Sequence, residues 1–228
     1  MTFDLNCDLG ELEDAVLEAR LMEQVTSANI ACGGHAGGEA AMERTVRLAL
    51  AHNVNIGAHP GYPDRANFGR LEIPMSEEEI EDTVLWQIGR LGAVTERLGA
   101  AIVHVKPHGA LYNVAVNNHA VARAIGSAVG EWNPRVRIFG LAGSPMLDVW
   151  RELGLQPVAE GFADRRYESD GTLRSRKLPG ALITDPAEAA AQALRLARAG
   201  AVETICVHGD TPGAPDILKA CRSALAGG

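Results

Sequence analysis

The chain has 228 residues, of which 46% are hydrophobic and 22% are charged, and these proportions are typical of one globular domain with a single large core. Acidic residues outnumber basic ones by 29 to 21, which argues against nucleic acid as the main partner because phosphate binding requires clustered Lys and Arg. No apolar stretch reaches the roughly 18 residues of a membrane span, so we expect no contact with the membrane.

Short apolar runs alternate with segments of helical period from the beginning of the chain to its end, which is the pattern of repeated strand-helix units around a parallel sheet. We predict seven strands, and we expect them to lie near residues 3–7, 27–32, 54–58, 102–106, 136–141, 157–162 and 203–207. The sequence contains no linker, so we expect one domain over residues 1–228.

Two of the intervening helices carry clear start and stop signals. Ser76 and Glu79 have the spacing of a capping box, and Gly99 stands where a glycine ends a helix. Asp185, followed by proline, repeats the start signal, and Gly200 repeats the stop.

Polar and glycine-rich clusters follow six of the predicted strands. They are Asn6 with Asp8 and Glu11, residues 29–35, His59, Lys106 with His108, Asp164 with Arg165, and His208 with Asp210. In a β/α barrel all strand C-termini open onto one face, where active sites lie. An open doubly wound sheet gathers ligands mainly at its switch point, so six clusters favour a closed barrel.

The first two clusters each allow two interpretations. Asp8 and Glu11 can bind a cation or transfer protons, or they can stabilise the start of a helix. In the segment SANIACGGHAGGE, backbone N–H groups can hold an anion at a helix start, and we expect Asn29 and His35 of this segment to bind substrate. Cys32 is either a nucleophile beside His35 or a small buried side chain. The glycine spacing is not GxGxxG, which argues against a dinucleotide site.

Histidines next to Gly or Pro at strand ends indicate ligands or proton carriers. His59 lies in GAHPG, and HVKPHGALYN places Lys106 and His108 two residues apart, on one side of an extended backbone. By contrast, His52 and His119 lie in a helical or loop context, where we assign them no function.

The last two clusters combine acids with a cation or a histidine. Asp164 and Arg165 form either a surface ion pair or a substrate contact, since an Arg fork binds carboxylates in a bidentate way. In CVHGDTPGA we expect Thr211 to cap a helix that begins at the next residue. Asp210 then either orients His208 or helps to cap that helix, and we also expect Asp210 among the residues that bind substrate.

The compartment follows from the beginning of the chain and from the cysteines. MTFDLNCDLGE carries acids where a secretory leader would carry basic and apolar residues. The four cysteines show no CxxC spacing, which indicates reduced thiols. We therefore expect a cytoplasmic protein.

Taken together, the segments DLNCDLGE, TSANIACG, IGAHPGYPD, HVKPHGALYN, GLAGS, FADRRYE, DGTL and ICVHGDTPGA resemble the LamB/YcsF family, the A subunits of prokaryotic 5-oxoprolinase. The resemblance implies a seven-stranded, distorted TIM-like β/α barrel of the glycoside hydrolase/deacetylase type. It also implies action on 5-oxoproline with ATP and Mg²⁺, together with two partner subunits, B and C. The residues that it implies for the site are Asp8, His59, Lys106, His108, Asp164, Arg165 and His208.

An unstrained lactam needs activation by a phosphoryl donor, and the chain has no GxxxxGK[ST] loop to bind one. We therefore expect partner subunits to activate the lactam oxygen and this chain to direct water onto the activated carbon. His108 or His59 would be the base, Lys106 would stabilise developing negative charge, and Arg165 would bind the substrate carboxylate.

Two other functions and the oligomeric state stay open on the sequence alone. One is a deacetylase-like, metal-dependent amide or ester hydrolase with Asp8, His59 and His108 around a divalent cation. The other is a non-catalytic member that binds a metabolite, since the loop after Glu11 is shorter than in the family. A homo-oligomer is compatible with either function.

Overall fold

The computed structural model describes residues 3–227 and contains a closed barrel of seven parallel strands in the order of the sequence. The strands are β1 (Asp4–Leu9), β2 (Ser27–Ala31), β3 (Asn55–His59), β4 (His104–Val105), β5 (Arg137–Leu141), β6 (Gln156–Phe162) and β7 (Thr204–Cys206). Pairing of β7 with β1 closes the barrel, with Leu5 opposite Ile205. The predicted seven-stranded barrel is therefore confirmed.

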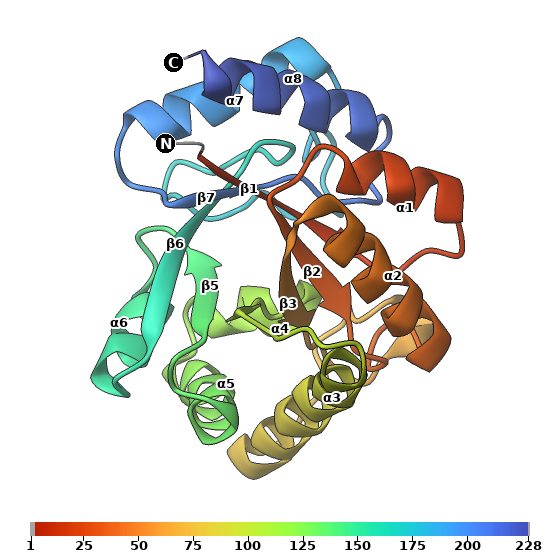
Figure 1. Cartoon of the computed structure of the whole chain (residues 1–228). Helices are drawn as coiled ribbons and strands as arrows, with labels where there is room; N and C mark the ends of the chain where they lie inside the picture. The colour runs from red at the N-terminus through yellow and green to blue at the C-terminus, as the bar shows by residue number, and fades with distance from the viewer. Residues whose placement is uncertain (1–2, 228) are drawn as a thin grey trace.

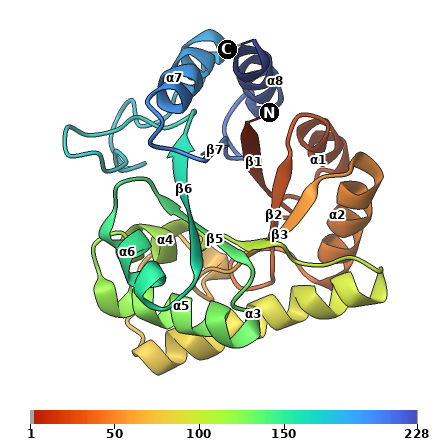
Figure 2. The same cartoon turned by 60° about the vertical axis from the view of Figure 1, so that its left-hand side comes forward.

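Helices surround the barrel on its outer side (Figures 1 and 2). They are α1 (Ala15–Met22), α2 (Glu39–His52), α3 (Glu77–Arg97), α4 (Gly109–Ala115), α5 (His119–Trp132), α6 (Pro145–Glu152), α7 (Pro186–Arg198) and α8 (Ala214–Ala226), with a 3₁₀ turn η1 (Arg65–Asn67). Helix α7 packs beside α8, and α3 packs beside α5. Within residues 3–227 no helix is both long and apolar enough to cross a membrane.

The expected helix signals lie where the helices begin and end. Ser76 and Glu79 form a complete capping box at the start of α3, and Asp185 accepts a hydrogen bond from the backbone N–H of Glu188 at the start of α7. Gly99 and Gly200 each follow a helix and have φ of +68°, a conformation that glycine adopts without steric cost.

The start of α8 differs from our expectation. The helix begins at Ala214 after Gly213, which has φ of +79°, and no side chain caps it. The hydroxyl of Thr211 donates a hydrogen bond to Asp164 instead. The prediction that Thr211 caps this helix was wrong, because a buried carboxylate competes for the hydroxyl.

The interior of the barrel is polar, whereas the aliphatic core lies between the strands and the helices. Asn6 donates to Glu160 at 3.0 Å and to Thr204 at 2.8 Å, which links three strands. His104 of β4 fits into the interior because its neighbour on β3 is Gly57, where a Cβ would approach the imidazole to 2.0 Å. Barrel interiors are usually filled with branched aliphatic side chains. The interior of this barrel is polar instead, and we therefore count its side chains as part of the site.

Candidate active site

A cavity of about 570 Å³ lies at the C-terminal ends of the strands, within the size range of about 300–1,000 Å³ that is typical of ligand pockets. Asp8, His59, His108 and His208 all line it. Asp8 and His59 lie at the C-terminal ends of β1 and β3, and His108 and His208 follow β4 and β7. The prediction that these four side chains meet at one barrel mouth is therefore confirmed.

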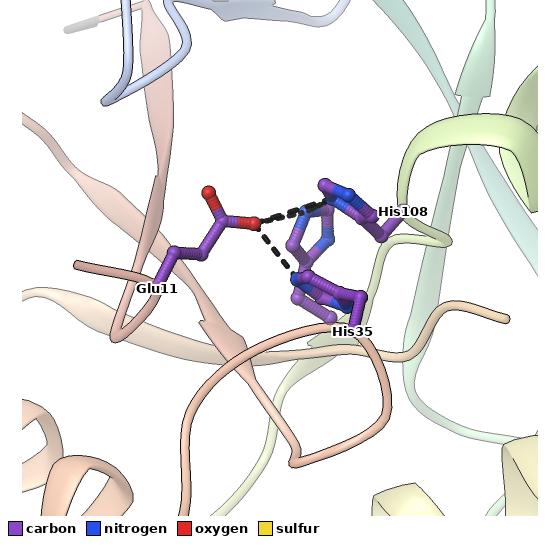
Figure 3. Close-up of side chains that lie close together, drawn as sticks. Glu11, His35 and His108 are labelled. Carbon is purple, nitrogen blue, oxygen red and sulfur yellow. Dashed lines mark hydrogen bonds and ion pairs between the residues drawn. The ribbon is translucent and has the colours of Figure 1, made fainter. Parts of the chain in front are cut away.

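At one wall of the cavity the carboxylate of Glu11 lies among three histidines, of which His59 and His108 line the cavity and His35 lies behind them. Figure 3 shows Glu11 with His35 and His108. Glu11 Oε1 lies 2.8 Å from His35 Nε2, 3.2 Å from His108 Nδ1 and 3.6 Å from His59 Nε2. The ring of His35 is stacked on that of His108, with centroids 3.6 Å apart. Gly61 and Gly69 make room for this stack, because a Cβ on either would come within 3 Å of His35 or His108.

Backbone carbonyls fix the orientation of two of these rings. His59 Nδ1 lies 2.8 Å from the carbonyl oxygen of Lys106, and His108 Nε2 lies 2.8 Å from that of Phe68. A carbonyl only accepts hydrogen bonds, so both of these nitrogens carry protons. The opposite nitrogens, His59 Nε2 and His108 Nδ1, face each other at 2.9 Å. In two neutral rings both would be bare lone pairs, so the arrangement favours a cation between them.

The charges of this wall follow from burial and from mutual contacts. Burial alone would raise the pKa of Glu11, but His108 and His35 outweigh it and hold that pKa well below its usual range. Burial, reinforced by His108, lowers the pKa of His35 to about 3. Burial also opposes charge on His59, yet Asp8 and Glu11 overcome it and raise the pKa of His59. Glu11 is therefore an anion, and His35 is a neutral ring that donates to it.

Lys106 lies at the floor of the cavity between two buried carboxylates. Its Nζ is 3.1 Å from Asp8 and 3.0 Å from Glu160, and it donates to Cys206 Sγ at 2.9 Å. Burial lowers the pKa of Lys106, but Asp8 and the other acidic neighbours outweigh burial and raise it well above its usual value. Lys106 also donates to Asn6 Oδ1 at 3.3 Å, so its three hydrogen bonds go to Asn6, Asp8 and Cys206. We expected Lys106 to stabilise charge that develops on a substrate, and in the structure its hydrogen bonds are made within the protein.

Asn29 and His35 lie behind the cavity wall. The amide of Asn29 donates to Asp8 Oδ1 at 2.8 Å, and its oxygen lies 2.8 Å from His104 Nε2. Both Asn29 and His35 are buried, and neither lines the cavity. We expected them to bind substrate, and the structure places them behind the wall, with Asn29 in contact with Asp8 and His35 in contact with Glu11.

Asp164 orients His208 on the opposite wall. Its carboxylate lies 3.0 Å from His208 Nδ1 and also accepts from the backbone N–H of His208 and from Thr211. Burial would raise the pKa of Asp164, but the contacts with His208 lower it. Arg165 is buried, lines the cavity and donates to the carbonyl oxygen of Arg174 at 2.7 Å. Asp164 and Arg165 are therefore not a surface ion pair.

Asp210 belongs to the rim of the cavity. It forms ion pairs with Arg70 and with Arg176, the latter at 3.1 Å. Burial would raise its pKa, and Arg176 and the other cationic neighbours lower it. Asp210 therefore neither orients His208, a role that Asp164 takes, nor caps α8.

Sequence reasoning missed Glu160, Arg70 and Arg176. Glu160 had a detectable signal, because it lies two residues before Phe162 on β6 and so faces the interior like Phe162. The two arginines lie in loops, and the sequence carries no sign of their pairing with Asp210. Cys32 is buried, with a pKa raised by burial to about 12, which fits the buried interpretation and not the nucleophile.

A sequence model of the LamB/YcsF family matches residues 3–227. The chain belongs to the LamB/YcsF family. Among its relatives, a protein from Chloroflexus aggregans that is named as the A subunit of 5-oxoprolinase is 48% identical, with 99% of this chain and 95% of the relative covered. A protein of the same name from Pyrococcus furiosus is 43% identical, with 99% and 94% covered.

Solved structures agree with this family assignment. The crystal structure of a lactam utilization protein from Thermus thermophilus is 41% identical and superimposes with a TM-score of 0.91, covering 100% of this chain and 97% of that one. A family 4 carbohydrate esterase from Streptomyces lividans has a TM-score of 0.53 at 12% identity, covering 99% of this chain and 88% of that one. The second likeness concerns the fold alone, because one fold supports many functions.

Proposed function

We propose that this LamB/YcsF chain is the A subunit of an ATP-dependent 5-oxoprolinase, which opens the lactam of 5-oxo-L-proline to L-glutamate together with two partner subunits, B and C. The observation that carries the proposal is the match, over almost the whole chain, to relatives named as A subunits of 5-oxoprolinase. The cavity supports it, because proton-transfer groups and cations from distant loops surround one space that suits a small ligand.

The charges at the mouth of the cavity suit an anionic substrate. Arg70, Arg165, Arg176 and Lys177 line the cavity, with Asp210 as the acid that pairs with two of them. A cluster of cations in a concave site attracts anions even when the whole protein is acidic. Arg165 is the residue that we assign to the carboxylate of 5-oxoproline, since a guanidinium binds carboxylates through parallel hydrogen bonds.

The chemistry is divided between subunits. A five-membered lactam is a poor electrophile, and the sequence has no P-loop to bind ATP. Partner subunits therefore hydrolyse ATP with Mg²⁺ and activate the lactam oxygen, and this chain delivers water to the activated carbon. The water is activated at the wall of Glu11, His59 and His108, where two ring nitrogens face each other.

Reconstitution tests this division of labour. The purified chain with 5-oxoproline, ATP and Mg²⁺ should release little or no glutamate, whereas addition of both partner subunits should start glutamate release with matching ADP formation. Rapid ATP-dependent turnover by the isolated chain would contradict the proposal.

The same assay separates the two other functions. ATP-free hydrolysis of acetylated sugars by the isolated chain would indicate a deacetylase-like hydrolase instead. An assembled complex that binds 5-oxoproline without turnover would indicate a non-catalytic member.

A further inference from the structure

The ligand atoms of Glu11, His59 and His108 are spaced like three corners of a metal coordination tetrahedron. The three distances between Glu11 Oε1, His59 Nε2 and His108 Nδ1 are 2.9, 3.2 and 3.6 Å. In a tetrahedral site the distance from the ion to each nitrogen or oxygen ligand is about 2.0–2.1 Å, so two ligand atoms lie about 3.3 Å from each other. The three atoms therefore surround a point that an ion can occupy with small adjustments.

The contacts behind these atoms are those of metal ligands. Metal-bound histidines usually donate their other N–H to a backbone carbonyl or a carboxylate, which fixes the tautomer. His59 and His108 do so through the carbonyl oxygens of Lys106 and Phe68. In their neutral forms both rings consequently present lone pairs toward the same point, next to the carboxylate of Glu11.

His35 supports this group without joining it. Its ring is parallel to that of His108 within 5°, and the centroids are 3.6 Å apart. An ion in the plane of His108 therefore lies too far from the plane of His35 for the lone pair of His35 to reach it. His35 Nε2 donates to Glu11 instead, and its Nδ1 has no partner among the described residues. It acts as the residue that orients the carboxylate ligand.

We propose that Glu11, His59 and His108 bind one divalent transition-metal ion of the zinc type at the wall of the cavity. Two imidazoles and one carboxylate suit zinc, cobalt, nickel or manganese, whereas Mg²⁺ and Ca²⁺ prefer oxygen ligands alone. All three residues line the cavity and His35 does not, so the open fourth position faces the substrate space. Three protein ligands with one open position are typical of catalytic sites, where the ion activates water or polarises a carbonyl.

This assignment changes the set expected from the sequence, in which Asp8 was the carboxylate ligand. Oδ1 of Asp8 is held by Asn29 and Lys106. Its Oδ2 lies 3.4 Å from His59 Nε2, beside the proposed ion. Asp8 therefore lies next to the three proposed ligands without belonging to them.

Metal binding by the tag-free full chain tests the proposal independently of any turnover. After treatment with chelator and dialysis, Zn²⁺ titrated in a calorimeter should bind at one ion per chain, and Co²⁺ should give visible absorption bands of a four- or five-coordinate site. Excess Mg²⁺ should not compete. Absence of stoichiometric Zn²⁺ binding, or a Co²⁺ spectrum of the hexaaquo ion, would overturn the proposal whatever the activity assay gives.

Variants assign the ligands. His59→Asn and His108→Asn should each abolish stoichiometric binding, and His35→Asn should weaken it by about 10- to 100-fold, as is typical for a residue that orients a ligand. His208→Asn is the matched control, because His208 lines the same cavity without belonging to the set, and its affinity should stay unchanged. The assignment would be overturned if His208→Asn lost as much metal affinity as the ligand variants. It would also be overturned if a folded His108→Asn chain kept the full affinity. If a ligand variant fails to fold, the Co²⁺ spectrum of the wild-type chain still decides.

Discussion

Replacing Lys106 by Met should destabilise the chain strongly. Lys106 Nζ lies about equally close to Asp8 and Glu160, at 3.1 and 3.0 Å, and none of the three side chains is more than 3% exposed. Met preserves most of the volume but leaves Glu160 buried without its cationic partner and Asp8 with His59 alone. Breaking a buried ion pair by removing one partner costs about 3–5 kcal/mol, against a total stability of about 5–15 kcal/mol for a typical domain.

Urea denaturation at pH 7, followed by circular dichroism, measures this loss in the isolated chain. Adding Glu160→Gln to Lys106→Met should recover part of it, because the buried charge of Glu160 that lost its cationic partner is then absent. The exposed Lys219 on α8 provides the control, since Lys219→Met should change stability by less than about 0.5 kcal/mol. A loss below about 1 kcal/mol for Lys106→Met, or strict additivity in the double variant, would refute the reasoning.

Three further changes test other parts of the structure. Burial lowers the pKa of His104 to about 3, so its contribution to stability is complete above the unfolded pKa of about 6.5 and is lost as the pH falls toward 3. His104→Phe should make the fall of stability between pH 6 and 4.5 shallower by up to about 1.4 kcal/mol per pH unit, and an unchanged slope in urea titrations would contradict this. His108→Ala should lower glutamate release by the reconstituted complex by about 10²- to 10⁴-fold with the fold intact, whereas wild-type rates would remove His108 from the mechanism. Arg165→Ala should raise KM for 5-oxoproline by about 10- to 100-fold, the equivalent of one charge-assisted hydrogen bond, and an unaltered KM would show that another group binds the carboxylate.

The strands could be predicted from the sequence because each is a short apolar run between turn signals, and those signals are local. Even β4, only His104–Val105 in the structure, was expected over residues 102–106. Pairing does extend across that range, since Val103 and Lys106 donate to carbonyl oxygens of β3. The start of α8 was mispredicted because it depends on a distant carboxylate, Asp164, which local sequence does not reveal.

The sequence predicted several of the residues that line the cavity, but it predicted fewer of the contacts that they make with one another. Position after a strand brought Asp8, His59 and His108 to one cavity without knowledge of any contact. The role of each residue depends on which neighbours form hydrogen bonds or ion pairs with it. Lys106 is engaged by Glu160, and Asp210 is engaged by two loop arginines. These contacts join residues 34 to 140 positions apart, and no local pattern encodes them.

The polar contacts inside the barrel both stabilise the fold and position the residues of the site. Asn6 lies in β1, Glu160 lies in β6 and Lys106 follows β4, so their contacts with one another form only when the barrel is closed. Buried polar groups stabilise one arrangement through the partners that they find, and unpaired ones are costly. The same bonds fix Asp8 at the floor of the cavity. Substitutions in this interior therefore affect stability and site geometry together, so a loss of activity there implies a role in catalysis only when the variant retains the unfolding free energy of the wild type.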